Sequence, residues 1–71
     1  MNLKRADLER KYPKGVKLRL TEPIEDDYTP KKVGDIFVVD YADDNNQLHG
    51  HWESGGSMAL IVGYDKFEVV K

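Results

Sequence analysis

The sequence predicts a mainly β protein: a small five-stranded barrel with a short N-terminal α-helix. Stretches in which apolar and polar residues alternate recur at short intervals, as they do in half-buried strands. Turn-forming residues such as Ser54-Gly55-Gly56 separate these stretches. The 71 residues leave room for a single domain, 1–71. Within it we place the helix at about 2–12 and the barrel at about 15–70.

The composition favours a cytoplasmic protein that holds no cofactor. The chain has no cysteine, which excludes disulfides and thiolate metal sites. No apolar run approaches the roughly 20 residues of a membrane helix, and the charged start MNLKRADLERKYPKG is unlike a secretory signal. Eleven basic and 13 acidic residues give a net charge of −2, without the basic excess of a duplex-binding domain. We expect no membrane partner, and a monomer or weak homodimer.

A short helix is predicted at 2–12, where good helix formers predominate. Leu8 and Tyr12 are four residues apart and share one face of this helix. Pro13 and Gly15 then end it. Because two or three turns are not stable alone, we expect Leu8 and Tyr12 to pack against the barrel.

A half-buried strand at 16–21, VKLRLT, precedes the longest irregular stretch, 22–34. Pro23 and Pro30 interrupt regular structure there. A loop of 13 residues is long for so small a domain, and long ordered loops often carry function. We expect Tyr28 and Pro30 to pack back onto the barrel, because a thin core needs its aromatic residues. The alternative is that they form half of a binding groove.

Four further strands are predicted, at 35–41, 48–53, 57–62 and 67–70. Phe37, Val39 and Tyr41 would share one face of the first of these. We expect a single helical turn at 63–66, after which Phe67 and Val69 face inward and close the barrel. Five short strands, close turns and one long early loop describe an SH3-like barrel better than an OB-fold. The OB-fold usually needs more residues and a helix between its third and fourth strands.

Several stretches resemble the short bacterial and phage family catalogued as domain of unknown function 4314. They are ERKYPKGVKLRL, the element Asp27-Tyr28-x-Pro30, Gly34 before a hydrophobic strand, and QLHGHWESGGSMALIVGYDKFEVV. The resemblance covers nearly the whole chain. It implies a small SH3-like fold, often encoded near mobile elements, with no established activity and no catalytic residues.

Two positions depart from the pattern of that family. Gly50 stands where a valine is expected, and Val62 stands where a proline is common. A glycine at an inward position removes a side chain from the core and weakens the strand. Either a neighbouring aromatic residue fills the space, or the strand is bent there.

His49 and His51 lie two residues apart and share the outer face of their strand with Glu53. A His-x-His pair with a carboxylate is one arrangement for zinc or nickel. No further ligand lies at a diagnostic spacing, so we expect a solvated strand face and no metal. Ser54 and Ser57 flank a glycine turn, but no strained nucleophile elbow is present. We therefore expect that the protein is not an enzyme.

The function we predict is the binding of a protein or peptide. An acidic loop beside exposed aromatic side chains would suit a basic or proline-containing segment. The residues of this predicted site are Glu25, Asp26, Asp27, Tyr28, Tyr41, Trp52 and Tyr64. A buried Trp52 would remove the centre of such a groove.

The alternative function is nucleic-acid binding through the basic N-terminal segment. Its residues are Lys4, Arg5, Arg10, Lys11, Lys14, Lys17 and Arg19. The acidic loop and the negative net charge count against it, because both would repel phosphate. A third possibility is an accessory protein that self-associates through a strand edge.

Overall fold

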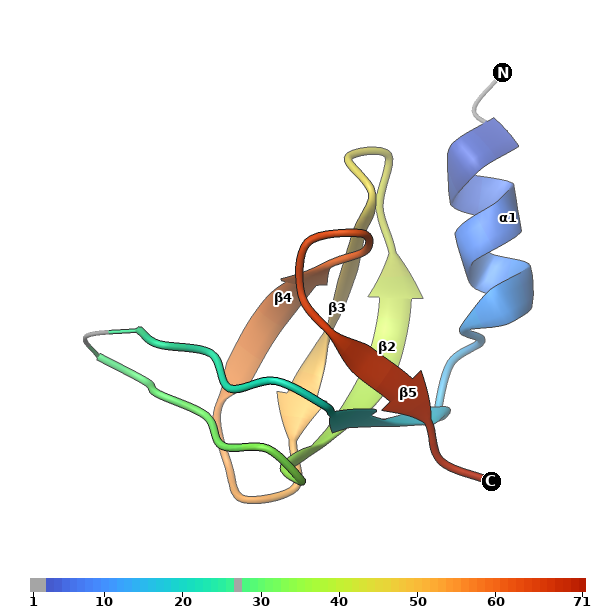
Figure 1. Ribbon diagram of the computed structural model, residues 1–71. Helices are drawn as coiled ribbons and strands as arrows, with labels where there is room; N and C mark the ends of the chain where they lie inside the picture. Colours follow the sequence, from blue (N-terminus) through green and yellow to red (C-terminus); the bar gives the residue numbers. More distant parts are fainter. Residues whose placement is uncertain (1–2, 27) are drawn as a thin grey trace.

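The computed structural model describes residues 3–26 and 28–71 and contains one helix and one antiparallel sheet (Figure 1). The elements are α1 (Leu3–Lys11), β1 (Lys17–Leu20), β2 (Ile36–Ala42), β3 (Gln47–Trp52), β4 (Ser57–Ile61) and β5 (Phe67–Val69). The strand order in the sheet is β4-β3-β2-β1-β5. In the described part of the chain β4 and β5 do not pair, so the sheet is open. The mainly β class is confirmed, and the closed barrel is not.

The helix packs on the sheet through the two residues that the sequence indicated. Leu8 is buried in the core, and the ring of Tyr12 meets that of Phe67 edge-on, with 5.6 Å between ring centres. Figure 1 shows α1 on the β2 side of the molecule, opposite the long loop, and α1 contacts β2. No helix in the described residues is long and apolar enough to cross a membrane.

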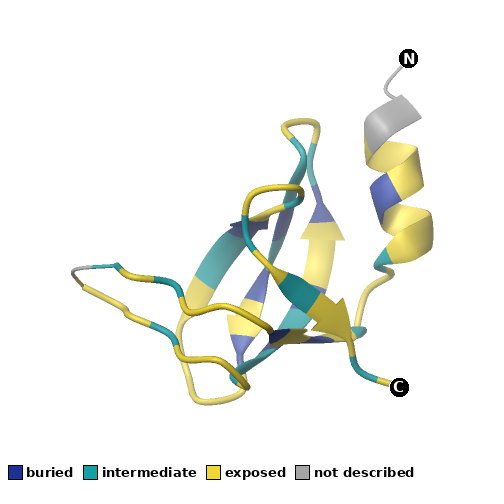
Figure 2. Ribbon diagram, viewed as in Figure 1, coloured by how far each residue is buried: buried dark blue, intermediate teal, exposed yellow. Residues whose placement is uncertain are grey.

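The core lies on one face of the sheet, and all of its described side chains are apolar. Figure 2 shows buried positions on successive strands and one in α1. The buried residues are Leu8, Leu18, Leu20, Phe37, Val39, Ala42, Leu48, Trp52 and Leu60. Alternate residues of β1 and β3 contribute to this face, as the alternation of apolar and polar residues predicted.

A β-bulge in β2 places Tyr41 on the face opposite Phe37 and Val39. The register with β3 pairs Val39 with Gly50 and then Tyr41 with His49, so Asp40 is an extra residue. The bulge turns Tyr41 outward, where it is 53% exposed, and brings Ala42 into the core. The prediction that Tyr41 shares one face with Phe37 and Val39 is therefore wrong, whereas the prediction that Tyr41 is exposed is confirmed.

The C-terminal strand does not close the sheet. β5 pairs only with β1 in the described residues; Phe67 is half-buried and Val69 is exposed. The single helical turn predicted at 63–66 is a hydrogen-bonded turn that begins at Ile61. In it the amides of Tyr64 and Asp65 donate to the Ile61 carbonyl at 3.1 and 2.9 Å.

Gly50 is required by the close approach of β2. A Cβ atom at this position would lie 2.0 Å from the Val38 carbonyl oxygen and 2.9 Å from the Phe37 ring. The sequence left two alternatives for the missing side chain: a neighbouring aromatic residue fills the space, or the strand is bent. The first is confirmed, because the Phe37 ring occupies the space. The neighbouring bulge also bends the partner strand.

A candidate peptide-binding groove

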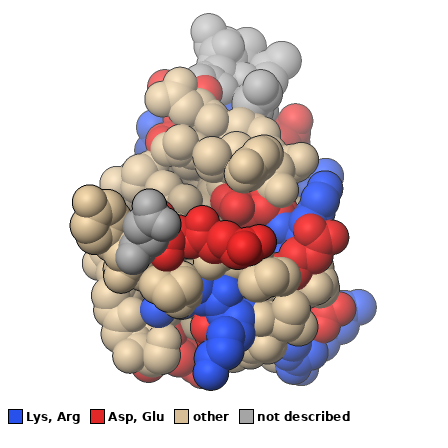
Figure 3. All heavy atoms as spheres, turned by 60° about the vertical axis from the view of Figure 1, so that its left-hand side comes forward, with Lys and Arg blue, Asp and Glu red and all other residues tan. Residues whose placement is uncertain are grey.

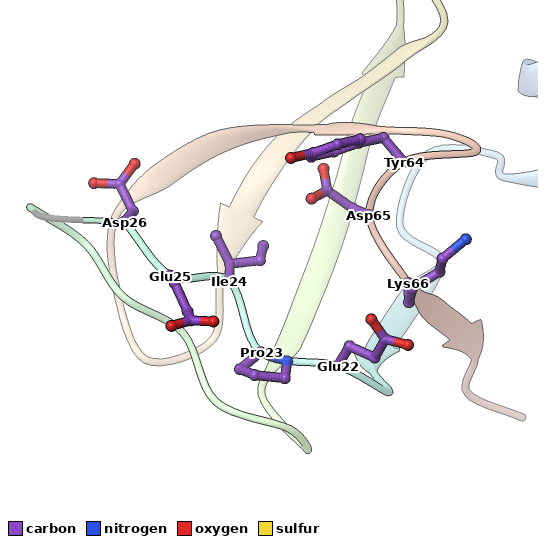
Figure 4. A pocket seen from close by; sticks show the side chains of 8 residues that line it. All are labelled: Glu22, Pro23, Ile24, Glu25, Asp26, Tyr64, Asp65 and Lys66. Carbon is purple, nitrogen blue, oxygen red and sulfur yellow. The ribbon is translucent and has the colours of Figure 1, made fainter.

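A groove lies between the long loop, residues 21–35, and the turn at 62–66. It has a volume of about 450 Å³. Its lining residues are Glu22, Pro23, Ile24, Glu25, Asp26, Tyr64, Asp65 and Lys66. Figure 4 shows Ile24 and Tyr64 pointing toward each other across the groove, while Glu22 and Lys66 lie side by side at the end near β5. We call this hollow the loop–turn groove.

Local hydrogen bonds shape the loop that forms one wall. The amides of Ile24 and Lys31 each donate to the other residue's carbonyl, at 2.9 and 3.0 Å, and hold the two arms of the loop together. Near the tip, Asp26 Oδ1 accepts hydrogen bonds from the amides of Tyr28 (2.8 Å) and Thr29 (3.2 Å). This is the turn that an aspartate side chain makes with its own backbone. These bonds lower the pKa of the Asp26 carboxyl below its ordinary value of 3.8.

An aspartate also shapes the opposite wall. Asp65 Oδ2 accepts a hydrogen bond from the Ile61 amide at 2.7 Å, which ties the turn to the end of β4. Gly63 has a φ of +93°, a left-handed conformation that favours glycine. The turn holds Tyr64 at the groove, where the residue is 75% exposed.

The loop–turn groove is acidic. Its lining carries four carboxylates and one ammonium group, that of Lys66. Glu22 and Glu25 are exposed and form no hydrogen bond or ion pair within the described residues. Figure 3 shows a band of acidic side chains across the face that carries the loop, with basic side chains below it. The groove therefore offers two carboxylates, Glu22 and Glu25, that no described side chain binds in an ion pair.

Trp52, predicted as the centre of the binding site, belongs to the core. Its side chain is 3% exposed, and its ring meets that of Phe37 edge-on with 5.1 Å between centres. Lys31 Nζ lies 5.1 Å from the centre of the Trp52 ring and 3.4 Å from Ser54 Oγ, and so joins the loop to the β3–β4 turn. Trp52 is thus corrected from a ligand contact to a core residue that also holds the loop.

The structure brings only some of the predicted site residues together. Glu25, Asp26 and Tyr64 line the loop–turn groove. Tyr28 is 93% exposed, so the expectation that it packs back on the barrel is wrong. Tyr41 lies on the outer face of the sheet and does not line the groove. Asp27 is outside the described residues.

Sequence reasoning missed five of the eight residues that line the groove. The missed residues are Glu22, Pro23, Ile24, Asp65 and Lys66. The turn at 62–66 is about 40 residues from the loop in sequence, and only the pairing of β1 with β5 brings them together. No local pattern carries that information.

Both histidines on the outer face of the sheet contact carboxylates. His49 Nε2 lies 2.6 Å from Asp43 Oδ2, and the ring stacks on Tyr41 with 4.6 Å between centres. His51 Nδ1 lies 3.4 Å from Asp40 Oδ2. The contact with His49 is the main cause that lowers the pKa of the Asp43 carboxyl below 3.8.

A second hollow, of about 400 Å³, lies beside His49, between residues 40–41 of β2 and residues 57–58 of β4. Among the described residues, no three His, Asp or Glu side chains converge as a metal ion requires. The face thus presents paired polar groups.

The basic residues of β1 proposed for nucleic-acid binding are paired with carboxylates. Lys17 Nζ lies 2.7 Å from Glu53 Oε2, and Arg19 donates to Glu68 Oε2 at 2.9 Å. Exposed pairs of this kind stabilise the fold little. Their neutralisation does, however, weaken the positive field that would attract phosphate.

The basic residues of α1 follow the same pattern. Arg5 pairs with Glu9 (3.4 Å) and Asp44 (3.9 Å), and Arg10 contacts Asp7. The exposed residues Lys11 and Lys14 form no ion pair within the described residues, and the side chain of Lys4 lies outside them. The structure thus leaves two described basic residues of this set free.

The fold and the groove define a small domain in which one open antiparallel sheet supports an acidic, loop-lined groove. The chain belongs to the family described as domain of unknown function DUF4314, whose model matches residues 2–70. No curated protein and no solved structure matches the chain.

Proposed function

We propose that this domain is a non-enzymatic binding module that takes a basic protein segment in the loop–turn groove. The observation that carries the proposal is the pair of carboxylates, Glu22 and Glu25, which form no ion pair within the described residues, in a groove that also presents the exposed residue Tyr64. Lysine and arginine side chains complement the carboxylates, and arginine also stacks on aromatic rings. An apolar residue of the partner would contact Ile24.

We further propose that the open sheet belongs to the SH3-like class. The strand order, with β1 between β2 and β5, supports this assignment. The position of the longest loop, directly after β1, supports it as well. The fold class alone does not name a function, so the binding proposal depends on the groove and not on the class.

The test is affinity capture from host lysate with the tagged domain and two matched variants. Glu22→Gln with Glu25→Gln removes both free carboxylates from the groove. Glu9→Gln with Asp44→Asn is the control, because it removes the same charge from exposed residues outside the groove. We expect the first double variant to lose the captured protein, and the control to retain it.

Nuclease treatment and salt distinguish protein binding from the alternative function, nucleic-acid binding. A protein captured with and without nuclease, and lost only in the groove variant, supports the proposal. Capture that vanishes with nuclease or falls steeply with salt would contradict it, and would favour phosphate contacts through residues such as Lys11 and Lys14. Equal loss in both double variants would indicate a response to net charge and would also count against the groove.

A further inference from the structure

The edge strand β4 is unusual in its lack of protection. β4 comprises Ser57–Ile61, SMALI, and contains no charged residue. The other edge strand, β5, has three residues, and its central residue Glu68 is paired with Arg19. Proteins commonly protect edge strands with charge, proline, bulges or short length, because an open edge can pair with another chain. β5 is protected in this way, whereas β4 is not.

Alternate residues of β4 direct their backbone groups away from β3. Two hydrogen bonds fix the pairing at the ends of the strand: the Trp52 amide donates to the Gly56 carbonyl, and the Val62 amide donates to the Asn46 carbonyl, both at 2.9 Å. Hydrogen-bonded positions in an antiparallel pair recur at every second residue. The amides that face away from β3 are those of Ser57, Ala59 and Ile61.

The loop–turn groove begins where this edge ends. The Ile61 amide donates to Asp65 Oδ2 at 2.7 Å, and the Ile61 carbonyl accepts from the amides of Tyr64 and Asp65. The turn therefore occupies the backbone groups of Ile61, whereas the outward backbone groups of Ser57 and Ala59 have no hydrogen-bond partner among the described residues. Because Tyr64 and Asp65 also line the groove, the open part of the edge leads toward its carboxylates.

We propose that the basic segment adds to β4 as an extra strand, with its main chain hydrogen-bonded to Ser57 and Ala59. This inference rests on the proposed function and specifies how the partner is held. In strand addition, main-chain bonds supply affinity and alternate side chains supply specificity. Here the basic side chains would reach the groove at the Asp65 end. A second copy of this chain fits less well, because its own β4 would bring no basic side chain to the groove.

The test measures amide hydrogen exchange by NMR on the intact chain. The probe is the tightest member of a synthetic peptide library in which arginine or lysine alternates with varied residues. We expect saturating peptide to slow exchange at Ser57 and Ala59 by about tenfold or more, the order expected for ligand-linked protection. Phe67 and Val69 are the matched controls, because their amides face away from β1 on the other edge and should not change.

A second peptide separates main-chain pairing from side-chain recognition. N-methylation at every second amide keeps its charge and side chains but removes donors, so we expect it to bind at least about tenfold more weakly. If the first peptide binds and shifts the resonances of Glu22 and Tyr64 while exchange at Ser57 and Ala59 stays unchanged, strand addition is overturned and the groove proposal stands. Equal affinity of the N-methylated peptide also overturns strand addition. A library in which no member binds overturns both.

Discussion

Replacement of Trp52 by alanine tests whether this residue belongs to the core or contacts a ligand. The Trp52 side chain is 3% exposed, packs edge-on against Phe37, and lies under the ammonium group of Lys31. The variant removes all three contacts and leaves a large cavity in a thin core. We therefore expect its main effect on stability, with any loss of binding a consequence of unfolding.

The expected loss is a large share of the total stability. Truncation of a buried tryptophan to alanine costs about 3–5 kcal/mol, of which the ring contact with Phe37 contributes about 1 kcal/mol. Typical stabilities per residue give a domain of this length about 4–11 kcal/mol in all. For a domain of this size, a loss of about 4 kcal/mol lowers Tm by about 15–30 °C. At the growth temperature of its host, Trp52→Ala should therefore be largely unfolded or close to its unfolding midpoint.

Thermal and urea unfolding followed by far-UV circular dichroism measures this loss without the tryptophan signal. Trp52→Phe keeps an aromatic ring against Phe37 and should lose less stability. Tyr64→Ala is the surface control, because Tyr64 is 75% exposed and the change in the free energy of unfolding should stay within about 0.5 kcal/mol. A Trp52→Ala variant with the wild-type Tm that no longer captures the partner would refute the assignment of Trp52 to the core.

Three further outcomes are expected. Gly50→Val should lower the free energy of unfolding by about 1–3 kcal/mol in urea titrations, because its Cβ would meet the Val38 carbonyl. The lowered pKa of Asp43 stabilises the fold above pH 3.8, and this contribution is lost as pH falls through the folded-state pKa. The difference in unfolding free energy between wild type and Asp43→Asn should therefore shrink in acid. A difference that stays constant with pH would contradict this expectation. Equimolar zinc should leave the ring resonances of His49 and His51 unmoved, whereas shifts at both that disappear in His51→Ala would overturn this expectation.

Short-range periodicity predicted the strands because burial follows it directly. In β1 the apolar residues Leu18 and Leu20 are buried, while Lys17 and Arg19 are exposed. The pattern places each strand within about one residue of its observed bounds, the usual uncertainty of strand ends. Leu8 was also identifiable, since a short helix must bury an apolar residue to persist.

The wrong predictions concern positions whose surroundings are set by strand pairing and not by the local sequence. The stretch DIFVVDY alternates in phase up to Tyr41, and only the extra residue Asp40 in the pairing with β3 turns Tyr41 outward. A bulge depends on the partner strand and leaves no signal in its own sequence. The two walls of the loop–turn groove likewise meet only through the pairing of β1 with β5, so composition alone could not combine Ile24 with Tyr64.

The aspartates and glutamates of the groove have different roles because their side chains differ in length. Asp26 and Asp65 use their carboxylates to bind backbone amides, and so give the loop and the turn their shapes. Aspartate is short enough to reach nearby backbone, and this property explains its frequency in turns. Glu22 and Glu25 make no such bond within the described residues and leave their charge available to a partner. Substitution of the glutamates should therefore change affinity alone, whereas substitution of the aspartates should change the shape of the groove as well.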